Sequence, residues 1–448
     1  MNPTYGRDRL RRVANPGARS HFRRKEFMRR IASAVLGGAL TLGGCTGGES
    51  PGSEARWSFE RDTLGDTIVV RTLSGSEWGT PARLEERMSI GVADGAEELM
   101  LGNVRALDVG PDGVIHVLEG TPSLKQFDTS GTFLRTVGRL GSGPGEYRRP
   151  DGGLAVLSDG RIVVRDPGNG RMAVFASDGT PLATWRINST FNTSRKLYRD
   201  GTDNLYTMVL IGPADDPADW VLGVQRFGPD GTPGDSIAAP RWTWDRAIIK
   251  AQREGSTSVS DVPFSPEAHW AFSPLGYMVG GLATNYRIDV FHRGGVLRIE
   301  RNAPAVPVAS EEAADLRRVA TAEMASQYPG WTWNGPDVPT TKPPFRELFV
   351  SDDGRIWVLL SRPGIKDPAV ESEADGSRPS PSAWTEPVAF DVFEPDGRYL
   401  GEVTAPVGFL ASPQPVFRGD TVWATAEDAD GVRYVKRYQV VRDSAAAR

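Results

Sequence analysis

The chain has 448 residues, with 52 Lys and Arg against 57 Asp and Glu, and it holds a single Cys. Its 51 Gly and 34 Pro exceed average usage and indicate many turns, and the length allows one large all-β domain. A single Cys excludes an internal disulfide and a Cys-rich metal site. The acidic balance argues against a nucleic-acid partner.

The N-terminus has the pattern of a secretory signal. Residues 1–30 hold ten Lys or Arg and two acids, and residues 31–44 are uncharged and apolar. A membrane-spanning helix needs about 20 apolar residues, so this shorter run fits a signal h-region instead. We predict a signal peptide over 1–44. Translation could start at Met1 or Met28, and Arg24–Arg29 leaves a twin-arginine export route open. Removing 1–44 leaves 42 bases against 55 acids, a net charge of -13.

The lone Cys ends this segment. Leu42-Gly43-Gly44-Cys45 resembles the lipobox of bacterial lipoproteins. The resemblance implies cleavage before Cys45 and acylation of its thiol; a buried core Cys after an ordinary signal is the alternative. Residues 45–56 are rich in Gly, Ser and Pro and predict a flexible tether. We expect a lipid-anchored protein of the cell envelope, on the outer membrane if the source is a diderm bacterium.

A turn pattern repeats along the rest of the chain. Asp-Gly pairs precede short β-rich runs at Asp112-Gly113, Asp159-Gly160, Asp200-Gly201 and Asp353-Gly354, with weaker copies at Leu275-Gly276 and Gly419-Asp420. A second series of turns follows runs that end in Phe127, Phe175, Phe227, Phe291 and Phe393. Gly accepts positive φ and Asp hydrogen-bonds the neighbouring backbone, so each pair favours a tight hairpin. One unit therefore contains four antiparallel strands, as in a propeller blade.

We predict an all-β fold, a six-bladed β-propeller of four-stranded antiparallel blades over residues 57–448. The blades begin near residues 104, 154, 195, 270, 346 and 414. The last blade lacks its outer strand, which an N-terminal strand supplies, either Leu84–Ile90 or Thr67–Thr72. The run from Ile162 to Phe175 resembles the NHL repeat, and residues 84–440 resemble bacterial six-bladed NHL-like propeller lipoproteins. This resemblance implies the fold and leaves the function open.

The long connections are expected on one face. They are residues 138–153, 210–220, 238–269, 301–344 and 361–387, and by strand parity all lie opposite the Asp-Gly turns. Segment 301–344 predicts a short helical insertion between blades four and five, capped by Ser310, with Leu316, Ala320 and Met324 on one side. Large loops on one face of a rigid scaffold commonly bind partners.

Candidate binding residues lie on this loop face. Four indoles stand on the long loops, Trp242, Trp244, Trp331 and Trp333, and could form a ligand shelf or pin the loops to the body. Glu119, Asp166 and Asn169 follow second strands near the predicted tunnel mouth, and Arg171 lies beside them. Glu119 and Asp166 could hold calcium, which takes oxygen ligands and would resemble calcium-dependent six-bladed lactonases, or could cap their own loops.

We predict a lipid-anchored, exported and monomeric binding module that takes a protein or glycan through its loop face. The alternative is a calcium-dependent hydrolase or lyase with its site at the central tunnel mouth. A structural envelope protein without a small ligand is a third possibility. His116, His269 and His292 fall at separate places in the repeat, which argues against a three-His zinc site.

Overall fold

The computed structural model describes residues 57–442, except 121–122, 188–192, 194, 212–219, 254–255, 293 and 369–381. The predicted signal peptide, Cys45 and the tether up to residue 56 lie outside the described residues. The part of the chain described contains no helix of the length and apolar character that crossing a membrane requires.

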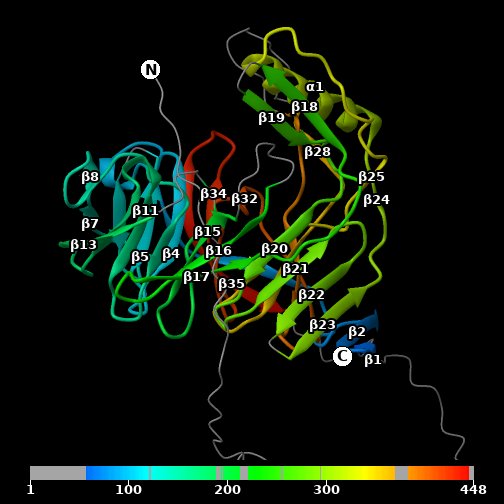
Figure 1. The fold of residues 1–448 in the computed structure, drawn as a ribbon, viewed down its shortest axis with the longest axis horizontal. Helices are drawn as coiled ribbons and strands as arrows, with labels where there is room; N and C mark the ends of the chain where they lie inside the picture. The colour runs from blue at the N-terminus through cyan, green and yellow to red at the C-terminus, as the bar shows by residue number, and fades with distance from the viewer. Residues whose placement is uncertain are drawn as a thin grey trace, which may run out of the picture. The chain divides into compact units, whose positions relative to one another are not determined.

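Three four-stranded antiparallel sheets follow one another in chain order (Figure 1). The first contains β4 (Val104–Val109), β5 (Ile115–Glu119), β6 (Leu124–Phe127) and β7 (Phe133–Val137). The second contains β10 (Leu154–Val156), β11 (Ile162–Asp166), β12 (Arg171–Phe175) and β13 (Pro181–Arg186). The third contains β14 (Tyr198–Arg199), β15 (Leu205–Leu210), β16 (Leu222–Phe227) and β17 (Pro233–Ala238).

The fourth sheet has the same core and two added strands. It contains β20 (Ala268–Phe272), β21 (Met278–Leu282), β22 (Arg287–His292) and β23 (Gly295–Arg301). Strand β2 (Thr67–Ser74) pairs parallel with β23, and β1 (Ser58–Leu64) pairs with β2 at the edge. The candidate closing segment Thr67–Thr72 therefore extends the fourth sheet.

The last sheet has nine strands and contains two four-stranded groups. One is β26 (Phe345–Val350), β27 (Ile356–Leu360), β30 (Ala389–Phe393) and β31 (Tyr399–Thr404). The other is β33 (Val416–Arg418), β34 (Thr421–Glu427), β35 (Arg433–Arg442) and β3 (Ala82–Ile90), with β32 (Phe409–Leu410) also paired to β34. Strand β3 pairs antiparallel with β35, so the segment Leu84–Ile90 completes the C-terminal group.

The turn chemistry explains the hairpins. Gly113, Gly160 and Gly354 have φ between 83° and 87°, where a side chain is strained. The carboxylate of Asp112 accepts the backbone N–H of Val114 at 3.1 Å, two residues on. At Asp200-Gly201 the hairpin forms with the same backbone hydrogen bonds as at Gly113, from the Asp203 N–H to the Asp200 carbonyl and from the Asp200 N–H to the Asn204 carbonyl. The expectation for the glycine was wrong there, because Asp203 and not Gly201 takes the positive φ, at 63°.

Apolar clusters join each group of strands to the next. The predicted terminal residues Phe127, Phe175, Phe227 and Phe393 are fully buried in them. Val163 and Trp185 of the second sheet, for example, pack with Leu205 and Phe227 of the third. One cluster joins the C-terminal group to the first sheet, with Ile90 and Val435 against Val104 and Phe127. Residues 88–127 and 416–435 therefore share a core.

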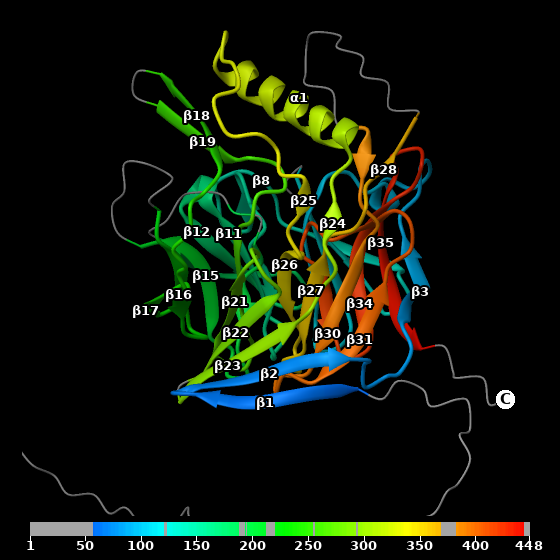
Figure 2. The same cartoon turned by 90° about the vertical axis from the view of Figure 1, so that its right-hand side faces the viewer.

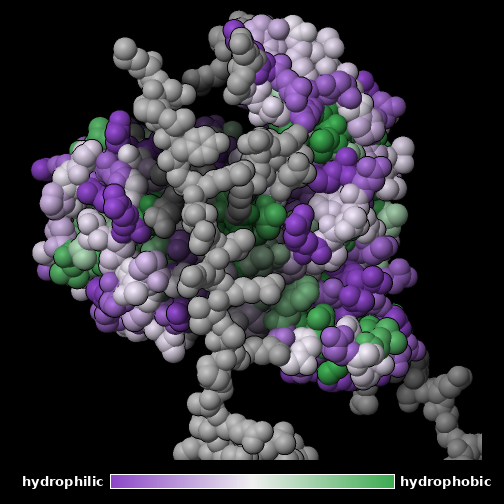
Figure 3. Space-filling model, viewed as in Figure 1, coloured by the Kyte–Doolittle hydropathy of each residue, from purple (hydrophilic) through white to green (hydrophobic). Residues whose placement is uncertain are grey.

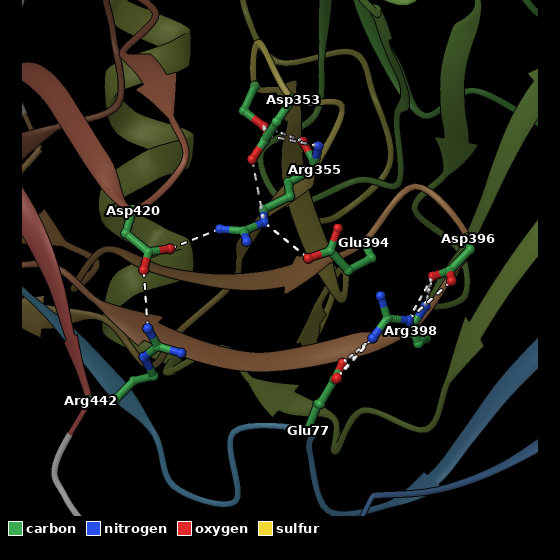
Figure 4. A network of polar contacts seen from close by, with 9 residues as sticks. Glu77, Asp353, Arg355, Glu394, Asp396, Arg398, Asp420 and Arg442 are labelled. Atoms are coloured by element: carbon green, nitrogen blue, oxygen red, sulfur yellow. Dashed lines mark hydrogen bonds and ion pairs between the residues drawn. The ribbon is translucent and has the colours of Figure 1, made fainter.

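A network of ion pairs links the turns of the nine-stranded sheet (Figure 4). The Arg355 guanidinium lies 3.1 Å from Glu394 and 2.8 Å from Asp420, which also pairs with Arg442 of β35 at 3.1 Å. Arg398 reaches Glu77 at 2.8 Å. These side chains are partly exposed, so single pairs contribute little, and the linkage of N-terminal and C-terminal segments is the main consequence.

The long insertions contain secondary structure of their own. We call the cap the hairpin β18 (Ile248–Arg253) and β19 (Ser256–Asp261) with α1 (Ser310–Gln327). Short strand pairs β24 (Val306–Pro307) with β25 (Thr341–Lys342), and β28 (Ile365–Lys366) with β29 (Trp384–Thr385), lead toward it. Figure 2 shows α1, β18 and β19 beyond one end of the sheet strands and β1 and β2 at the other.

The predicted Ser310 cap is wrong in detail. Ala309 occupies the N-cap position, so Ser310 lies one residue inside α1, and the helix has no side-chain cap. Glu311 and Glu312 in the first turn still suit its positive end. Over the face seen in Figure 3, hydrophilic residues spread across both the sheets and the cap, with hydrophobic residues in smaller areas between them.

Candidate functional site

The cap has an apolar core built from two insertions. Ile249, Ala251 and Val262 of segment 238–269 pack with Met324 of α1, and Trp331 and Trp333 cover them. The Trp331 indole N–H donates to the Lys250 carbonyl at 3.0 Å, and that of Trp333 to the Gly335 carbonyl at 2.9 Å. Both indole N–H groups are therefore hydrogen-bonded to backbone carbonyls inside the cap. This arrangement agrees with the alternative in which the tryptophans pin the loops to the body.

The other two predicted tryptophans hold segment 238–269 in place. The Trp244 indole N–H donates to the Pro266 carbonyl at 3.2 Å. The Trp242 ring lies against Phe291 at 6.4 Å between centroids, and a Cβ added at Gly280 would stand 2.7 Å from its Cη2 atom. Trp242 thus packs directly on the backbone of the fourth sheet.

The third insertion, residues 361–387, locks onto the same helix. The Asp315 carboxylate of α1 accepts the Ser382 hydroxyl at 2.8 Å and the Ala383 N–H at 3.0 Å. The fully buried Lys342 ammonium lies 2.5 Å from Glu312 of α1 and 3.1 Å from Glu386. Since breaking a buried ion pair is costly, these contacts hold α1 in one position.

Three polar residues meet at the starts of consecutive first strands. Arg195 precedes β14, His269 is in β20 and Glu347 is in β26. One Glu347 oxygen lies 3.8 Å from Arg195 Nη2 and 3.9 Å from His269 Nδ1. Arg195 also donates to the Trp270 carbonyl at 2.9 Å, and its guanidinium lies 4.9 Å from the Trp270 ring centroid. We call Arg195, His269 and Glu347 the strand-start cluster.

The strand-start cluster combines charged and neutral polar groups. Burial lowers the pKa of His269, and Glu347 offsets this only in part, so the imidazole is neutral at pH 7. The distance of 3.9 Å between His269 and Glu347 exceeds a hydrogen bond. The cluster therefore contains one cation, one carboxylate and a neutral imidazole.

Sequence reasoning placed His269 at a blade start and missed Arg195 and Glu347. The signal was available, because two of the predicted blade starts fall near 195 and 346. First strands all begin on the same face, so charged residues at these starts converge. The predicted histidines do not meet: His116 lies in β5 and His292 ends β22.

Asp166, Asn169 and Arg171 hold the connection before the second sheet. Asp166 is fully buried and accepts the N–H groups of Arg148 and Arg149 at 3.0 and 2.8 Å. The Asn169 amide donates to Asp166 at 2.7 Å, and Arg171 donates to the Gly143 carbonyl at 2.6 Å. These contacts correspond to the loop-capping alternative. Whether the three residues also bind a ligand stays a prediction.

Glu119 lies in a different place, at a pocket of about 510 Å³. Its carboxylate accepts the Gly102 N–H at 2.7 Å and pairs with Lys125 at 2.9 Å. Asp166 does not line this pocket. Within the described ranges, no three His, Cys, Asp or Glu residues are grouped so as to hold a metal ion. The calcium-dependent alternative therefore gains no support from the arrangement of Glu119 and Asp166.

Comparison with known proteins adds evidence on the fold. No protein-family model matches the chain, and no curated protein matches it. A DUF4221 family member from Bacteroides vulgatus is similar in structure, with a TM-score of 0.50 at 8% identity, over 81% of this chain and 99% of that one. A Bacteroides fragilis protein whose name marks it as exported gives 0.43 at 10% identity, over 85% and 99%. Virginiamycin B lyase from Staphylococcus aureus gives 0.38 at 8% identity, over 80% and 100%.

At these identities the likeness concerns the fold alone. The strand content, the four-stranded groups and the similarity to the DUF4221 structure all indicate the same fold class. The chain has a mostly β, β-propeller-like fold.

Proposed function

We propose that this chain is an exported, lipid-anchored six-bladed propeller of the NHL type that binds a protein or glycan partner through its cap. Six apolar clusters, each between consecutive four-stranded groups and including the last with the first, support the six-bladed arrangement. The lipobox pattern ending at Cys45 supports the anchor and a place in the cell envelope.

The interlocked cap carries the proposal. Its core is separate from the clusters that join the sheets, so the sheets do not need the cap to complete their own packing. Two other insertions, residues 238–269 and 361–387, nevertheless meet on α1 of segment 301–344, the first through Met324 and the second through Asp315. A surface fixed in this way loses little conformational entropy when a partner binds, which favours affinity.

The test uses charge reversal on the cap surface. Arg317→Glu with Glu323→Lys changes two exposed positions of α1, and Arg186→Glu with Asp235→Lys is the matched control on the outer strands β13 and β17. The full chain is applied to a glycan array and cross-linked to isolated envelope proteins. We expect the cap variant to reduce saturable binding about tenfold and the control to leave it unchanged.

Two results would contradict the proposal. One is the absence of saturable binding to both the array and the envelope proteins. The other is equal binding by the cap variant and the wild type, with both folded by circular dichroism.

A further inference from the structure

The pocket at Glu119 lies between the first sheet and the short helix η1 (Glu97–Leu99), away from the cap. Its volume of about 510 Å³ is in the range of small-ligand sites. Glu97, Glu98, Glu119 and Lys125 supply its charge, and Phe133 and Met100 supply apolar walls.

Glu119 and Lys125 form an ion pair in the lining of the pocket, so their charges cancel and their side chains are held in place. The side chains of Lys125 and Glu119 are 10% and 5% exposed and lie 2.9 Å apart. The Lys125 ammonium also donates to the Met100 carbonyl at 3.2 Å and the Glu97 carbonyl at 3.3 Å, which uses its three donors. Lys125 is therefore not free to bind an anion.

The rim keeps two uncompensated negative charges. Glu97 is exposed and Glu98 is partly buried. Neither rim carboxylate has a hydrogen bond or an ion pair with any residue in the described ranges. With Glu119 and Lys125 cancelling, the lining has a net charge of -2, and a concave site of one sign attracts ligands of the opposite sign.

The repeat provides an internal comparison. Counted from the terminal phenylalanines, Lys125 corresponds to Asp391, and Phe133 corresponds to Tyr399. In the later sheet this place is filled: the Tyr399 hydroxyl donates to Asp391 at 2.6 Å, and the Arg301 guanidinium, paired with Asp391, lies 4.5 Å from the Tyr399 ring centroid. Lys125 replaces the Asp391 carboxylate at this register, so the two sheets share only the room beside the aromatic ring: Arg301 fills it beside Tyr399, whereas the pocket lies beside Phe133.

We propose that the pocket binds a ligand carrying a primary ammonium group on an aliphatic stem. The ammonium lies toward Glu97 and Glu98 and the stem along Phe133 and Met100, so charge attraction and apolar contact act on one molecule. The carboxylates are not grouped for a metal ion, so the site suits an organic cation. The proposal does not depend on binding at the cap.

The test compares three probes of one shape on the full chain, pentylammonium, pentan-1-ol and pentanoate. Saturation-transfer NMR and calorimetry report binding. We expect pentylammonium to bind, pentan-1-ol to bind about tenfold more weakly, and pentanoate not to bind, because only the first gains from the rim charges. Added salt should weaken pentylammonium binding. Equal binding of pentylammonium and pentan-1-ol, or no binding of pentylammonium, would overturn the proposal.

Variants locate the site. Glu97→Gln with Glu98→Gln should weaken pentylammonium binding about tenfold, whereas Asp62→Asn with Asp235→Asn, which removes the same charge at exposed positions elsewhere, should not. Phe133→Leu keeps an apolar wall and removes the ring, and should weaken binding a few-fold. Equal loss in the rim variant and the charge control would place the probe elsewhere and refute the assignment.

A blocked Gly-Gly-Lys-Gly-Gly peptide distinguishes the source of the ammonium. Tighter binding than pentylammonium would identify a lysine side chain of a partner protein, and weaker binding a free amine. Either result supports the ammonium site, provided that the rim variant loses it.

Discussion

His116 makes the stability of this protein sensitive to mild acid. The imidazole is 2% exposed; Nδ1 lies 3.1 Å from the Val114 carbonyl and Nε2 lies 3.0 Å from the Gln126 amide nitrogen. A carbonyl only accepts, so Nδ1 carries the hydrogen and Nε2 accepts from Gln126. A second proton on Nε2 would face that amide donor and bury a charge. Burial accordingly lowers the pKa of His116 to about 4.

The sign and size of the effect follow from linkage. An unfolded His has a pKa of about 6.5. Between about pH 6.5 and 4, His116 is therefore protonated in the unfolded chain and neutral in the folded chain. The contribution of the neutral imidazole to the free energy of unfolding is fully present above about pH 6.5 and is lost as the pH falls toward 4. With these two pKa values, the loss is about 2 kcal/mol at pH 5 and about 3 kcal/mol below pH 4.

Urea unfolding of the full chain at about pH 7.5 and about pH 5 measures this loss. His116→Gln removes the titrating group, and His292→Gln changes an exposed histidine as the control. Carboxylates titrate equally in all three chains, so the difference isolates His116. The pH-dependent drop should be about 2 kcal/mol smaller in His116→Gln than in the wild type and the control. An equal drop in His116→Gln and the wild type would refute this reasoning.

Three further predictions concern the turns, the cap and calcium. Gly231→Ala should cost several kcal/mol more than Gly276→Ala by urea unfolding, since both have positive φ but only the first would place a Cβ 2.2 Å from the Trp185 ring; equal costs would contradict the clash. Lys342→Met should cost about 3 to 5 kcal/mol and expose α1 to hydrogen exchange, because it leaves buried carboxylates uncompensated. A loss below about 1 kcal/mol would contradict that role. Adding or chelating calcium should leave Tm unchanged; a shift abolished by Asp166→Ala would show the opposite.

Local chemistry made much of the fold predictable. Asp-Gly turns such as Asp112-Gly113 are set by φ preference and a hydrogen bond two residues away, so they can be recognised without knowledge of the rest of the chain. The same holds for Phe127 and Phe175, whose spacing from the turns indicates burial. At Asp200-Gly201 the pattern predicts the hairpin but not its residue of positive φ: the left-handed position falls on Asp203, whose carboxylate also accepts the backbone N–H of Ser158 at 3.0 Å.

The candidate sites depend on distances that the sequence does not contain. Within the described strands β18 and β19, only Ile249 and Ala251 are buried. Their apolar partner Met324 lies in another insertion, so the sequence of segment 238–269 indicated a plain loop. The strand-start cluster forms only when three sheets are set side by side. The pocket at Glu119 depends on how residues 97–102 cross the first sheet, which no local pattern predicts.

The pairing of β3 with β35 sets the order in which the protein can fold. β3 is made first among the strands of its group, and β33, β34 and β35 are made last. Contacts of such large sequence separation form slowly, because the intervening chain must be closed into a loop first. During synthesis, the edge of β3 that pairs with β35 therefore stays unpaired until residues near 442 have been made. A chain that stops short of β35 would leave β3 with only its short parallel pairing to β31, and would remove Val435 from the core between the first and last sheets.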